Sequence, residues 1–100
     1  MKLQVQSIRF DADEKLLAYI QKKCDKLDSF FDRIQDGQVY LRIEKSGEPS
    51  LKSVEIKINV PGEVLIASEE AYSFEEATDL ATETLKRQVK RYKEKLREHN

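Results

Sequence analysis

The chain has 100 residues, which is the length of one ordinary domain and enough to bury a single hydrophobic core. Hydrophobic residues make up 39% and charged residues 37%, and the formal net charge of −1 excludes a chain kept unfolded by its own charge. A single cysteine excludes an internal disulfide, and no apolar run approaches the ~18 residues of a membrane span. We therefore expect one cytoplasmic domain, residues 1–100, without a signal peptide.

A strand and a helix are predicted at the start of the chain. Residues 2–8 alternate apolar with polar side chains, as in a half-buried strand. Asp11 or Asp13 can then cap a helix, and Gly37 beyond it is expected in a turn. The apolar face of this helix is predicted from residues at steps of three and four: Leu17, Ile20, Cys24, Leu27 and Phe31.

Three further strands are predicted in the middle of the chain. Alternation over residues 38–45 and 53–60 indicates two strands, separated by the turn formers of residues 46–50. The Pro61-Gly62 pair makes a tight turn into a short fourth strand, at about residues 64–67.

The remaining residues predict one long helix and complete the fold. Residues 74–98 contain no glycine or proline, and one helical face carries Phe74, Ala77, Ala81, Leu85, Val89, Tyr92 and Leu96. The element order is therefore β-α-β-β-β-α, and the alternating strands imply a sheet with one wet face. We predict an α+β fold of two layers, a four-stranded sheet with both helices packed on one face.

Positive charge is concentrated near the end of the chain. Residues 86–97 carry seven basic side chains and one acidic one, a net charge of +6, whereas residues 1–85 sum to −6. Most of these cations are predicted opposite the apolar face, and the first helix has a weaker basic face that could join theirs. The candidate binding residues are Lys22, Lys23, Lys26, Lys86, Arg87, Lys90, Arg91, Lys93, Lys95 and Arg97.

This basic surface has the chemistry of a nucleic-acid-binding site. Lysine and arginine at one-turn spacing suit a phosphate backbone, because release of condensed counterions supplies much of the affinity. We predict binding to structured RNA through its shape and phosphate positions. Two alternatives remain: a general double-stranded-RNA-binding domain, and an adaptor whose basic helix meets an acidic protein. A membrane partner is disfavoured, because the apolar face is needed for the core.

No catalytic or cofactor site is predicted. Cys24 and His99 are the only cysteine and histidine, which is too few for a zinc site, and Cys24 is interpreted as a small buried hydrophobic residue. Three glycines leave no phosphate-binding loop. Glu75 and Glu76 are interpreted as first-turn acids that complement the helix dipole. We expect neither an enzyme nor a protein that binds a cofactor or small-molecule substrate.

Four motifs resemble those of the ribosome hibernation-promoting factor family, also called ribosome-associated inhibitors or ribosomal subunit interface proteins. They are Leu16-x-x-Tyr19-Ile20-x-x-Lys23-x-x-Lys26-Leu27, Val60-Pro61-Gly62-x-x-Leu65-x-Ala67, Ala77-x-Asp79 and Leu85-x-x-Gln88-Val89-x-Arg91-Tyr92-Lys93. The resemblance runs nearly end to end. Departures from residues common in the family are Ser7, Asp13, Thr78, Thr84 and Arg91.

The resemblance implies a fold related to double-stranded-RNA-binding domains and a site on the small ribosomal subunit near the decoding centre. Phosphates of 16S rRNA would be contacted by Lys23, Lys26, Lys86, Arg87, Lys90, Arg91 and Lys93. The domain would block mRNA and tRNA binding and silence translation in stress or stationary phase, without turnover. It resembles the short family members, without a C-terminal dimerisation domain or tail, which in some bacteria cooperate with a separate ribosome-dimerising factor.

Overall fold

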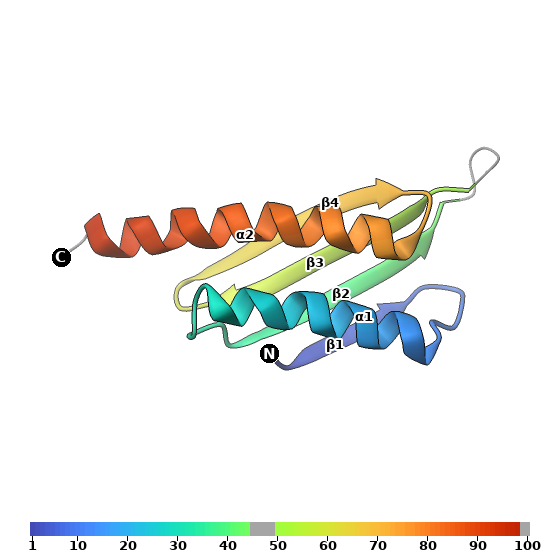
Figure 1. Ribbon diagram of the computed structural model, residues 1–100, viewed down its shortest axis with the longest axis horizontal. Coiled ribbons are helices and arrows are strands. Elements are labelled where there is room, and N and C mark those ends of the chain that lie inside the picture. The colour runs from blue at the N-terminus through green and yellow to red at the C-terminus, as the bar shows by residue number, and fades with distance from the viewer. Residues whose placement is uncertain (45–49, 99–100) are drawn as a thin grey trace.

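The computed structural model describes residues 1–44 and 50–98, apart from the side chain of Glu98. Its elements are β1 (Leu3–Ser7), α1 (Glu14–Asp25), the short 3-10 helix η1 (Lys26–Ser29), β2 (Asp36–Ile43), β3 (Lys52–Val60), β4 (Glu63–Ala71) and α2 (Phe74–Glu98). Figure 1 shows α1 and α2 side by side on one face of the sheet. The predicted α+β sandwich and its element order are therefore confirmed.

The four strands form one mixed sheet in the order β1-β2-β3-β4. β1 and β2 are parallel, since α1 lies between them in the chain, whereas β2, β3 and β4 are antiparallel neighbours. Inward side chains such as Val39 and Ile56 are fully buried, while the residues between them along each strand are at least partly exposed. One face of the sheet is thus wet, as predicted.

Asp13 caps the start of α1, since its side-chain Oδ1 accepts a hydrogen bond from the Leu16 backbone N–H at 2.8 Å. Its buried face starts at Leu16, and the prediction of Leu17 there is wrong, because Leu17 is 36% exposed. At 100° per residue, Leu17 lies on the side of α1 opposite Tyr19, which faces α2. The predicted helix also changes to 3-10 geometry after Asp25.

α2 has the predicted bounds and the predicted buried face, with Leu96 partly buried at its end. Thr78 and Thr82 are also buried, and their hydroxyls donate to the backbone oxygens of Phe74 at 2.7 Å and Thr78 at 2.9 Å. The Tyr92 hydroxyl donates to the Pro61 backbone oxygen at 2.6 Å, which ties α2 to the turn between β3 and β4. In the part of the chain described, no helix is both long and apolar enough to cross a bilayer.

The strands depart from prediction at two places. Gly37 lies inside β2 instead of in a turn, and glycine fits there because a Cβ would approach the Leu3 side chain at 2.7 Å. β4 extends well past residues 64–67, since it pairs with β3 along its whole length. The Pro61-Gly62 turn is confirmed, with φ of +79° at Gly62. Of the other predicted features, residues 46–49 and His99 lie outside the described residues.

Candidate nucleic-acid interface

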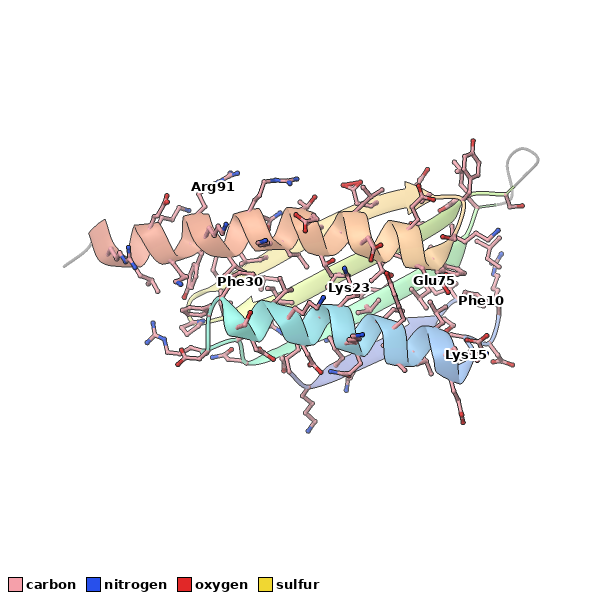
Figure 2. All side chains as sticks on the ribbon, in the orientation of Figure 1. Phe10, Lys15, Lys23, Phe30, Glu75 and Arg91 are labelled. Carbon is pink, nitrogen blue, oxygen red and sulfur yellow. The ribbon has the colours of Figure 1, made fainter. Side chains whose placement is uncertain are left out.

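The two helices meet along a polar seam (Figure 2). The Tyr19 hydroxyl donates to Asp79 Oδ1 at 2.5 Å, and Lys23 Nζ lies 3.2 Å from the same oxygen. The bond from Tyr19, reinforced by Lys23, holds the pKa of Asp79 below its ordinary value, while the same bond raises the pKa of Tyr19. Asp79 of α2 thus binds both Tyr19 and Lys23 of α1 and joins the two helices.

Phe30 follows η1 directly, and two lysines of α2 contact it. The Lys86 Nζ lies 4.9 Å from the centre of the Phe30 ring, within cation–π distance. The Lys93 Nζ donates to the Phe30 backbone oxygen at 2.7 Å. Beside the ring opens a hollow of about 240 Å³, here called the Phe30 hollow, which is also lined by Lys23, Lys26, Thr82, Glu83 and Lys86.

The ten basic residues predicted from the sequence fall into three groups. Lys23, Lys26, Lys86 and Lys93 lie at the seam between the helices. Lys22, Arg87, Lys90 and Arg97 are exposed. Arg91 and Lys95 line a separate hollow of about 230 Å³ over β4, and Figure 2 shows Arg91 on the side of α2 away from α1.

Lys86 and Lys93 are less exposed than the helical pattern predicts. The sequence places both opposite the apolar face, yet in the structure both side chains are partly buried beside Phe30. The reason is that α1 lies alongside α2, so the flank that would face water on an isolated helix becomes part of the seam. The aliphatic part of each lysine can cover apolar surface there, while the ammonium group of Lys93 keeps an oxygen partner and that of Lys86 lies over the Phe30 ring.

Charge changes sign along α2. Glu75 and Glu76 occupy its first turn, as predicted, and Asp79 and Glu83 follow, whereas every lysine and arginine of the helix comes from residue 86 on. α1 and α2 run in the same direction (Figure 1), so the basic C-terminal end of α1 lies on the same side of the molecule as the basic part of α2. Positive charge is thus gathered at one end of the helical layer.

Phe30 is the site residue that the sequence analysis missed. Its position follows Lys23 and Lys26 at steps of three and four, the spacing of one helical face, and this spacing could have placed it with those lysines. The neighbouring Phe31 belongs instead to the buried face, where its ring packs edge-on against Tyr92 at 5.3 Å. Only the packing of the two helices shows that Phe30 also meets Lys86.

Cys24 is fully buried in the core, as predicted, and burial raises the pKa of its thiol to about 12. Because the thiolate is the reactive form, we expect iodoacetamide to label the native protein at least ~100-fold more slowly than the urea-unfolded chain at neutral pH. Mass spectrometry of timed samples measures both rates. Equal rates would show that the sulfur is reachable in the native fold. Within the described residues, no group of three His, Cys, Asp or Glu side chains could hold a metal ion.

The fold of this chain is one shared with a ribosomal subunit interface protein. A solved structure of such a protein from Coxiella burnetii superposes with a TM-score of 0.83 at 24% identity, over 93% of this chain and 98% of that one. Residues 3–97 match the family described as Sigma 54 modulation protein / S30EA ribosomal protein. The chain belongs to this family, and the resemblance found in its motifs is confirmed.

Curated relatives carry the same resemblance along the whole domain. The chain is 30% identical over 99 residues to the ribosome hibernation promoting factor of Escherichia coli, covering 99% of this chain and 100% of that protein. It is 29% identical over 91 residues to the ribosome hibernation promotion factor of Deinococcus radiodurans, and there it spans 48% of the relative's length. Family members are binding proteins and not enzymes, which confirms the expectation that this chain is no enzyme.

Proposed function

We propose that this protein is a ribosome hibernation factor that binds 16S rRNA of the small subunit near the decoding centre. There it would block mRNA and tRNA binding and silence translation in stress or stationary phase, acting in the cytoplasm. The observation that carries the proposal is the convergence of Lys23, Lys26, Lys86 and Lys93 from two helices around Phe30. Membership of a ribosome-associated family supports the ribosome as the target.

The mechanism is steric and electrostatic, with no chemical step. Two of the seam lysines are already held in place, Lys23 by Asp79 and Lys93 by the Phe30 backbone oxygen. Such preorganisation reduces the side-chain entropy lost when a phosphate is bound. Exposed cations nearby, such as Lys90 and Arg87, extend the contact to further phosphates. A separate ribosome-dimerising factor could act together with the bound domain.

Co-sedimentation of the purified protein with 30S subunits, 50S subunits and free duplex RNA tests this function. Saturable binding to 30S subunits alone, followed by inhibition of translation in a purified system, is the expected result. Equal binding to duplex RNA would instead favour a general double-stranded-RNA-binding domain. Absence of RNA binding even at low salt would favour an adaptor for an acidic protein.

The affinity for 30S subunits should fall steeply with salt. If about five side chains contact phosphates, log affinity falls with log salt at a slope of about −3.5 to −4.5, since each contact contributes about 0.7 to 0.9. Dissociation constants between about 50 and 200 mM salt give this slope. A nearly flat dependence would contradict phosphate contacts. Lys57→Gln, on the open face of the sheet beside Tyr40, serves as the control and should leave the slope unchanged.

A further inference from the structure

We propose that Phe30 is a stacking platform for one unpaired RNA base, which enters the Phe30 hollow while the surrounding lysines hold the flanking phosphates. The inference rests on the proposed function and adds the class of ligand. The bound RNA would be a loop, bulge or single strand with a base out of its helix, and not continuous duplex. Aromatic side chains set among lysines are the usual means of binding such bases.

The Phe30 side chain is held firmly enough to act as a platform. Its backbone N–H donates to the Leu27 oxygen at 3.1 Å, and its backbone oxygen accepts from Lys93 at 2.7 Å. The ring is partly buried and packs against the hydrophobic core. It stands between two hollows, the Phe30 hollow and another of about 290 Å³ on the side of Asp32 and Lys93. Figure 2 shows it at the seam between α1 and α2.

The Phe30 ring is covered by a lysine side chain, as the Tyr40 ring is by Lys57 at 5.5 Å, whereas the Phe10 and Phe31 rings pack against other rings. Phe10 stacks on Phe74 at 5.1 Å, and Phe31 packs against Tyr92 at 5.3 Å. Over the Phe30 ring lies the ammonium group of Lys86, at 4.9 Å. A lysine side chain is flexible, so Lys86 can turn aside to a phosphate and leave the ring to a base. The π-face that attracts the cation also attracts a stacked base.

The lining of the Phe30 hollow offers partners to a base as well as to phosphates. Lys23 and Lys26 lie on the α1 side, where they can meet the phosphates of an entering strand. On the α2 side lie Lys86, Glu83 and Thr82, whose hydroxyl donates to backbone oxygens of its own helix. Glu83 would repel a phosphate but can accept hydrogen bonds from the amino group of adenine, cytosine or guanine. In the Phe30 hollow the base would therefore lie beside Glu83 of α2, and the flanking phosphates would lie beside Lys23 and Lys26.

The experiment exploits the lack of tryptophan in this chain. Phe30→Trp introduces one indole, and Phe30→Leu keeps an apolar side chain but removes the ring. The control Tyr72→Leu removes an aromatic ring that is 64% exposed, in the connection between β4 and α2. Each variant is titrated with 30S subunits, with a single-stranded oligoadenylate and with a duplex of equal length.

Phe30→Leu should lose roughly 5- to 100-fold in affinity for 30S subunits and for the single strand, as expected from the loss of one stacked base. Phe30→Trp should bind like the wild type, and the RNA should quench its fluorescence. Tyr72→Leu should bind unchanged. The salt slope should stay the same in Phe30→Leu, whereas Lys86→Gln should flatten it by about 0.7 to 0.9, because it removes one phosphate contact.

Wild-type affinity of a folded Phe30→Leu variant, or an unquenched indole in the saturated 30S complex, would overturn the stacking inference. A flattened salt slope in Phe30→Leu would also overturn it, because the ring would then act only by positioning Lys86. If Phe30→Leu does not fold, the fluorescence of Phe30→Trp decides. If the wild type itself fails to bind 30S subunits, the proposed function is wrong, and this outcome is distinct from a failure of the stacking inference alone.

Discussion

Changing Lys26, Lys86 and Lys90 together to glutamate is expected to weaken binding to 30S subunits by about 100-fold or more, because attraction to phosphate becomes repulsion. Lys26 and Lys86 line the Phe30 hollow, and Lys90 is exposed one turn further along α2. Lys93 is left unchanged, since its hydrogen bond to the Phe30 backbone oxygen links α2 to the segment after η1. The dissociation constant at fixed salt measures the effect, and circular dichroism confirms the fold.

A matched control separates the effect of the basic site from the effect of net charge. Lys15, Arg42 and Lys57 changed to glutamate alter the net charge by the same amount. Arg42 and Lys57 lie on the open face of the sheet, and Figure 2 shows Lys15 at the opposite end of α1. This control should keep its affinity within a few-fold. If both triple variants lose affinity equally, binding responds to overall charge, and the interface drawn from Lys26, Lys86 and Lys90 is wrong.

The second large effect is expected on stability. Leu85 is fully buried at the centre of the α2 face that packs on β3 and β4, so Leu85→Ala should lower the free energy of unfolding by about 2–5 kcal/mol. For a domain of this size the midpoint of thermal unfolding should fall by roughly 10–30 °C. Urea and thermal unfolding followed by circular dichroism measure both quantities.

Leu80→Ala is the matched control, since Leu80 lies on the same helix but is 45% exposed. It should change the free energy of unfolding by no more than about 0.5 kcal/mol. Similar losses in the two variants would mean that the assigned face of α2 is wrong. The folded fraction of Leu85→Ala should still bind 30S subunits, because Leu85 takes no part in the basic surface.

The fold is largely predictable because most of its elements carry their own signal. α2 has an unbroken helical period, and its bounds in the structure are those predicted. The predictions fail where contacts with a segment distant in the sequence determine the local structure. Gly37 has the local signature of a turn, but its lack of a side chain serves close packing with Leu3. The end of β4 includes Glu69 and Glu70, a poor strand signal, and it is kept extended by pairing with β3.

The candidate site was predictable as a charge pattern but not as a geometry. The seven cations from Lys86 onward can be counted in the sequence, and their gathering with Lys23 and Lys26 requires two helices that lie side by side. The contacts of Phe30 with Lys86 and Lys93 join residues more than fifty positions apart. The periodicity of one helix cannot predict contacts between two helices, so the Phe30 hollow could be found only from the structure.

The sign change along α2 also affects how the protein approaches its target. With acidic residues in its first half and cations in its second, α2 carries a charge dipole along its length, on a molecule 51 Å long. In the negative field of an RNA surface such a dipole experiences a torque that turns the basic end forward before contact. Encounters should then be guided in orientation as well as in rate, and the guidance should fade as counterions shorten the range of the field.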